Sequence, residues 1–342
     1  MKRYLSILAA IILAGCAKQP GAARLTERPD ASDGLTKIAI SGTRFLQYDT
    51  MGLFFCEHED VPGDSYAAAC SDLHFKEHNI GYNNVLVTKG AGADEWSFYN
   101  TILGRNVPYF FITGNDSHTM VDVFAYAPHV EGIEKPTEIP FEADYNRDLM
   151  YAVQNAGGTN KNLDPDVLNS GDLSMFFKHS LSCINLVMRT KYNVNGSSDH
   201  HVDYVTIRKA GAKTTPLYVK GNFNAITGTY SDLEEGDSLR VSSFFRRNVN
   251  NYFTGSEGKA FPVMIYPVDF AADGDLEIVL GIDGFRKVFP INKNELKHDD
   301  GFTYGFRRGV SYAFNFTVEN YVHFDGATVE QEWPIMQIDN TI

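Results

Sequence analysis

Two short motifs bring together side chains that could do chemistry. Residues 236–239 read Gly-Asp-Ser-Leu, a sequence that carries the nucleophilic serine in one class of esterases. That class needs its serine just after a first parallel strand near the N-terminus and an Asp-x-x-His motif further on. The chain holds no Asp-x-x-His motif and no alternating helix–strand pattern. We therefore predict no catalytic residue and no enzyme activity.

Residues 199–203, Asp-His-His-Val-Asp, contain side chains that can bind a metal ion. In a strand, however, adjacent side chains point to opposite faces, so His200 and His201 should not share an ion unless this segment is a loop. A polar hairpin is the better interpretation, and we predict no metal and no cofactor. His179 lies in an apolar segment and is expected to be a structural histidine with a partner that the sequence does not reveal.

A third candidate for chemistry is the thiol of Cys16. The cationic residues Lys2 and Arg3 precede an apolar run, residues 5–14, which is too short to span a bilayer but fits a signal peptide. Residues 13–16, Leu-Ala-Gly-Cys, look like a type II signal peptidase site, at which the cysteine takes a diacylglycerol. Residues 1–15 are then the signal peptide. The acyl chains on Cys16 anchor the protein in the membrane, and each buried methylene contributes about 0.8 kcal/mol of binding free energy. The alternative is an ordinary signal peptide with a chance cysteine.

Composition narrows the function further. The 342 residues carry a net charge of −13, which argues against binding nucleic acid or anionic lipid by charge. Three cysteines remain after Cys16, so at least one thiol is unpaired. Cys56 and Cys70 bracket a polar turn and could form a disulfide. Cys183 lies in an apolar strand pattern and is expected to be a buried thiol.

Strands are the elements that must position these side chains. Residues 16–34 are small and polar and form a tether. Short apolar runs bounded by Gly, Asn, Asp and Pro then follow in two sets, which is typical of β-sandwiches. We predict an all-β fold with domains at residues 35–170 and 171–342. The best helix candidate is residues 143–153.

Several sequence blocks occur in an order that resembles the fimbrillin family, the subunits of type V pili of Gram-negative bacteria. Residues 121–128 look like the F-A-Y-x-P strand near the end of the family's first domain. Residues 173–186 are similar to its L-x-F-x-H-x-L-S-x-I-x-L strand, which opens the second domain. Further matching blocks are residues 139–141, 148–150, 228–230, 264–267, 309–312 and 329–333.

The resemblance implies two transthyretin-like Greek-key β-sandwich domains in tandem and an assembly mechanism. A lipoprotein precursor reaches the outer membrane, and a protease cuts after an arginine that follows the first strand. Loss of that strand opens a groove, which a strand from another subunit fills. The implied partners are other pilin subunits, the outer membrane through the lipid, and a host surface receptor.

Residues 35–44 match the removable strand, with Ile38 and Ile40 as its apolar residues and Arg44 as the cleavage site. Arg24 and Arg28 are second choices for cleavage. The alternative is that Arg44 only ends a strand and that the subunit keeps its N-terminus. The donor would be the C-terminal segment, either a donor strand or the last strand of its own domain; its apolar residues are Ile335, Met336, Ile338 and Ile342.

A second function remains open. The chain has 24 Phe and 18 Tyr, which could form stacking platforms for sugars. With only two Trp, most of these rings are expected to fill the sandwich cores instead. The alternative function is therefore a lipid-anchored glycan-binding module at the cell surface.

Overall fold

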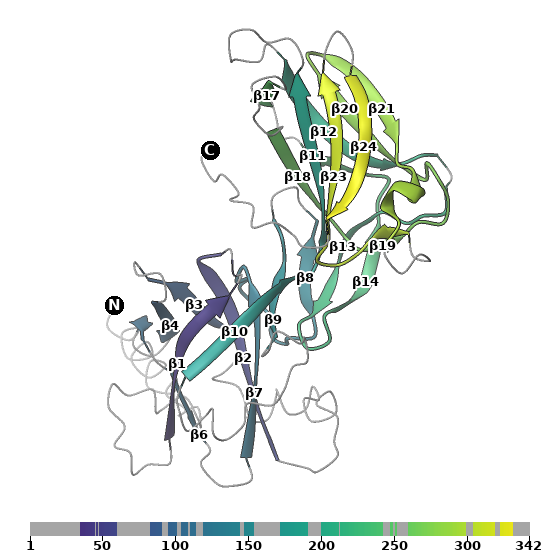
Figure 1. Cartoon of the computed structure of the whole chain (residues 1–342). Coiled ribbons are helices and arrows are strands. Elements are labelled where there is room, and N and C mark those ends of the chain that lie inside the picture. The colour runs from purple at the N-terminus through teal and green to yellow at the C-terminus, as the bar shows by residue number, and fades with distance from the viewer. Residues whose placement is uncertain are drawn as a thin grey trace, which may run out of the picture. The chain divides into compact units, whose positions relative to one another are not determined.

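The computed structural model is built almost entirely of β-strands, which confirms the predicted all-β class (Figure 1). In the part described, one short 3-10 helix, η3 (Lys293–Leu296), accompanies the strands, and no helix has the length and apolarity to cross a membrane. The structure describes residues 35–44, 46, 48–59, 83–90, 95–100, 104–108, 110–113, 119–143, 147–153, 172–190, 200–211, 213–241, 247–248, 250–251, 259–298, 304–318 and 322–330.

The chain divides into two compact units. One comprises Met1–Arg44, Tyr48–Pro136 and Val153–Phe176, and the other comprises Phe45–Gln47, Thr137–Ala152 and Phe177–Ile342. The segment 137–152 therefore belongs with the C-terminal part of the chain, and the chain passes between the units more than once.

A nine-stranded sheet has the order β5-β4-β3-β2-β7-β9-β10-β1-β6. In β3 of this sheet burial alternates along the strand, because Val85 and Val87 are buried and Leu86 is half-buried. The strands are β1 (Leu35–Arg44), β2 (Thr50–Glu59), β3 (Val85–Lys89), β4 (Trp96–Asn100), β5 (Arg105–Val107), β6 (Phe110–Thr113), β7 (Thr119–Ala127), β9 (Met150–Val153) and β10 (Asp172–His179).

The helix expected over residues 143–153 is wrong. Met150–Val153 forms β9, which lies between β7 and β10 in the sheet. Met150, Tyr151 and Ala152 are all buried. A short run that is apolar on both faces has no periodicity that separates a buried strand from a buried helix, and that ambiguity explains the error.

The second unit is a β-sandwich. One sheet has the order β17-β11-β23-β24, with β18 also on β11, and the other has the order β15-β12-β20-β21, with β16 also on β12. These strands are β11 (Ser182–Thr190), β12 (His201–Lys209), β15 (Ser238–Val241), β16 (Arg247–Asn248), β17 (Asn250–Asn251), β18 (Lys259–Ile265), β20 (Leu276–Ile282), β21 (Phe285–Pro290), β23 (Ser311–Val318) and β24 (Val322–Glu330).

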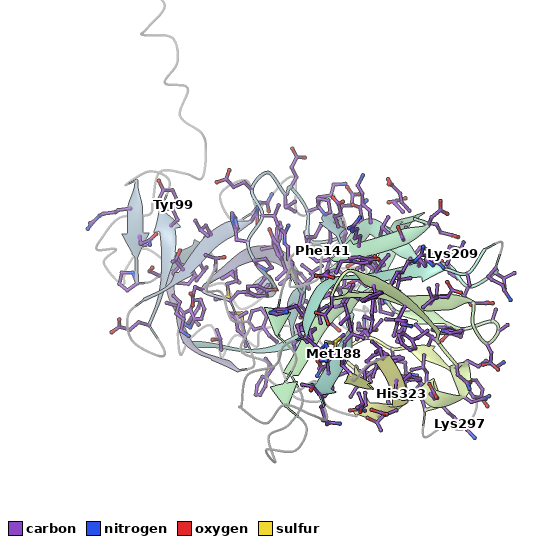
Figure 2. The ribbon with its side chains drawn as sticks, turned by 90° about the horizontal axis from the view of Figure 1, so that it is seen from above. Tyr99, Phe141, Met188, Lys209, Lys297 and His323 are labelled. Atoms are coloured by element: carbon purple, nitrogen blue, oxygen red, sulfur yellow. The ribbon has the colours of Figure 1, made fainter. Side chains whose placement is uncertain are left out.

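Aromatic side chains pack the two sheets together. Phe289 of β21 lies edge-on to Phe316 of β23, with ring centroids 5.1 Å apart, and 6.4 Å from Phe324 of β24. Met188 of the central strand β11 is fully buried, whereas Lys297 lies at the outer surface (Figure 2). Smaller sheets complete the unit: β14 (Thr229–Glu235) with β13 (Tyr218–Asn224) and β8 (Ile139–Glu142), and β19 (Val268–Asp269) with β22 (Gly305–Phe306).

Candidate strand-exchange site

Strand β1 changes partner along its length. Its first half, Leu35 to Ile38, pairs antiparallel with β6, and its second half, Ala39 to Arg44, pairs parallel with β10. In the strand order of the sheet, β1 therefore stands between β6 and β10. Alternating isoleucines and the β-branched Thr36 and Thr43 favour this extended conformation.

Ile40 anchors the second half of β1. It lies opposite Leu173 of β10, and only 6% of its surface is exposed. The register with β10 shifts between Ile40 and Gly42, so a β-bulge interrupts the ladder directly after this anchor. Ile38 lies opposite Phe110 of β6, and Arg44 ends β1 opposite Phe176; for both, the structure describes the backbone alone.

The remaining predicted site residues are spread more widely. Cys56 lies in β2 opposite Asp122. Cys183 is buried in β11, as predicted. The lipidation, cleavage and donor positions outside the described residues are Cys16, Arg24, Arg28, Ile335, Met336, Ile338 and Ile342, and Cys70 lies outside them as well.

Tyr126, in the block of residues 121–128, fixes the end of β7. Its hydroxyl donates to Asn84 Oδ1 at 2.7 Å and accepts from the Val130 amide at 3.1 Å. The side-chain amide of Asn84 in turn donates to the backbone carbonyl of Val130 at 2.7 Å. Burial raises the pKa of Tyr126 to about 12, so the hydroxyl stays protonated. Sequence analysis missed Asn84; its signal is an Asn-Asn pair directly before a strand, where Asn84 adopts φ +49.

Asp148 and His179 link two other blocks of the sequence. Asp148 Oδ2 lies 2.5 Å from His179 Nδ1, and the two side chains are 1% and 12% exposed. Burial raises the pKa of Asp148, while the hydrogen bond from His179 and those from the backbone of Leu149 and Leu181 act in the opposite direction. Asp148 is thus the partner of His179 that the sequence alone did not reveal.

Ser180, next to this pair, has a structural role. Its Oγ donates to the Leu149 carbonyl at 2.5 Å and accepts from the Tyr230 hydroxyl at 2.7 Å. The Ser180 amide also donates to the Leu149 carbonyl, at 2.8 Å. Because the Ser180 hydroxyl is engaged by Leu149 and Tyr230, it is not aligned with His179 as a nucleophile would be with its base. The cluster joins residues 148–149 to the turn between β10 and β11.

His200 and His201 both approach the carboxylate of Asp283. His200 Nδ1 lies 2.6 Å from Asp283 Oδ2, and His201 Nδ1 lies 3.8 Å from Asp283 Oδ1. His200 precedes β12, which begins at His201, so the alternation of side chains within a strand does not apply to this pair. No group of three His, Cys, Asp or Glu side chains is placed to hold a metal ion in the described part of the chain.

Comparison with known proteins agrees with this architecture. The model of the fimbrillin-like family matches residues 74–333. A crystal structure of a protein described as a cell adhesion protein, from Bacteroides uniformis, has a TM-score of 0.52 and 17% identity, covering 89% of this chain and 99% of that one. A fimbrial protein from Bacteroides vulgatus has a TM-score of 0.52 and 14% identity, covering 86% of this chain and 99% of that one.

At these identities, the two structures show the shared fold alone. A search of curated proteins gave no match. The family model, in contrast, spans most of the sequence and includes the blocks that hold Tyr126, Asp148 and His179. The chain therefore belongs to the fimbrillin-like family.

Proposed function

We propose that this chain is a structural and adhesive subunit of a type V pilus, exported as a lipoprotein and assembled by strand exchange. Membership of the fimbrillin-like family supports a fimbrial subunit at the cell surface that contacts other pilin subunits. The family is one of structural subunits and is not known for catalysis.

The observation that carries this proposal is the place of β1 between β6 and β10. Removing β1 leaves an unpaired backbone edge on β6 and another on β10, together with an empty place where Ile40 was buried. A strand from another subunit can fill both, because main-chain hydrogen bonds supply affinity and alternate side chains supply specificity. Each hydrogen bond contributes about 1 kcal/mol and each buried aliphatic side chain about 1.5–3 kcal/mol.

In the proposed route, Cys16 receives the lipid and the precursor is displayed at the outer membrane. Cleavage after Arg44 separates the lipidated segment and β1 from the rest of the chain. A donor strand from another subunit then takes the place of β1. This chain's own donor residues are Ile335, Met336, Ile338 and Ile342, which would serve the next subunit. A receptor on a host surface is a further proposed partner.

The N-terminus of the protein on cells tests this route. We expect mass spectrometry of surface protein to find a chain that begins at Phe45, and we expect Arg44→Ala to abolish this product. Arg28→Ala is the matched control and should leave processing unchanged. A mature chain that still begins at lipidated Cys16 in the wild type would contradict cleavage and favour a permanently anchored subunit.

A further inference from the structure

Strand β6 depends on β1 for its place in the sheet. Among the strands that the structure describes, β6 lies at the end of the nine-stranded order and pairs only with β1. Strand β10 differs, because it has β9 on its other side. Loss of β1 therefore leaves β10 paired with β9 at the edge of the sheet, but leaves β6 with no partner among the described strands.

Different parts of β1 hold these two neighbours. The four residues Leu35 to Ile38 pair with β6, and five of the six residues Ala39 to Arg44 pair with β10, with Ser41 unpaired at the bulge. No residue of β1 pairs with both neighbours. A strand that covers only one of these halves can rebuild only one of the two ladders.

We infer that the strand replacing β1 must supply ten consecutive extended residues, and this inference rests on the proposed function. Ten residues span about 33 Å at roughly 3.3 Å per residue. The partner is therefore a subunit whose donor segment is at least this long. A shorter donor restores the β10 ladder and leaves β6 unpaired.

The sequence of β6 makes that unpaired state unfavourable. It reads Phe-Phe-Ile-Thr, which is apolar and rich in residues that favour strands. An apolar strand with open backbone edges is a template for unwanted pairing with other chains. A ten-residue donor strand thus differs from a shorter one because it pairs with β6 as well as with β10.

Peptide replacement in the full chain tests this inference. A site for a sequence-specific protease is inserted after Arg44, and the cut protein is freed of its N-terminal segment in urea. It is then refolded with one of three peptides: Leu35–Arg44, the six residues Ala39–Arg44, or Leu35–Arg44 carrying Thr36→Pro and Lys37→Pro. The third peptide is the matched control, because it keeps the length but cannot form the β6 ladder. Hydrogen exchange is measured at the amides of residues 110–113 of β6 and 173–176 of β10.

We expect the ten-residue peptide to slow exchange at least tenfold in both strands. The six-residue and proline peptides should slow it in β10 only, or fail to bind. Equal protection of β6 by the six-residue or the proline peptide would overturn the length requirement and leave strand exchange intact. Failure of the intact ten-residue peptide to protect β10 would instead overturn the proposed function itself.

Discussion

His179 Nδ1 and Asp148 Oδ2 share a hydrogen bond of 2.5 Å, which ties the turn after β10 to a segment 31 residues earlier in the chain. Ser180, the next residue, binds the Leu149 carbonyl through both its amide and its hydroxyl. The adjacent residues His179 and Ser180 thus bind the adjacent residues Asp148 and Leu149. The contacts join the blocks at residues 148–150 and 173–186.

Removing one member of this pair should destabilise the protein strongly. Asp148→Ala leaves His179 and the backbone amides of Leu149 and Leu181 without their acceptor in a buried site. Breaking a buried pair costs about 3–5 kcal/mol. Urea unfolding at pH 7 measures the loss, and Asp237→Asn, at an exposed position, is the control, with an expected change below about 0.5 kcal/mol. If Asp148→Ala lowers the free energy of unfolding no more than Asp237→Asn does, the Asp148–His179 pair does not contribute to stability.

The same carboxyl group makes stability depend on pH. Burial raises the folded-state pKa of Asp148 above its ordinary value, so the folded protein binds a proton more tightly than the unfolded chain. The stability from this group is fully present below the unfolded pKa of about 3.9 and is lost as pH rises through the folded pKa. We expect the free energy of unfolding of the wild type, relative to Asp148→Asn, to fall as the pH rises from about 4. A difference that stays constant or rises with pH would contradict this.

The hydroxyl of Tyr126 should also contribute measurably. Tyr126→Phe removes the partner of Asn84 Oδ1 and of the Val130 amide while keeping the ring. Leaving such groups unpaired costs about 1–3 kcal/mol. Tyr99→Phe is the matched control, because Tyr99 is 41% exposed and removal of its hydroxyl should be nearly neutral. Equal effects of the two substitutions in thermal unfolding would show that the Tyr126 network is not stabilising.

Ile40 should determine how firmly β1 is held. Ile40→Ala removes buried aliphatic groups at a position that is 6% exposed, at a cost of about 2–4 kcal/mol. After cleavage at the site inserted behind Arg44, we expect the variant β1 to dissociate at least tenfold faster than the wild-type strand. Thr43→Ala, at a half-buried position of the same strand, serves as the comparison. Unchanged release for Ile40→Ala would mean that backbone pairing alone retains β1.

Local patterns in the sequence were sufficient for the fold class. Short apolar runs between Gly, Asn, Asp and Pro predicted an all-β protein, and the apolar run around Cys183 predicted a buried thiol; the structure confirms both. The same local rules failed at residues 150–153, where burial on both faces removes periodicity.

The sequence alone did not reveal which strands pair or which buried side chains bind each other. The polar-apolar alternation of residues 35–44 predicts a strand, but it does not show that one half pairs with β6 and the other with β10. Likewise, nothing near His179 in the sequence identifies Asp148, or links Tyr126 with Asn84, 42 residues away. Alternation and turn residues act over a few positions, so the sequence by itself determined the strands. Pairing joins segments that are distant along the chain, so only the tertiary structure decided which strand β1 holds in place and which buried groups satisfy one another.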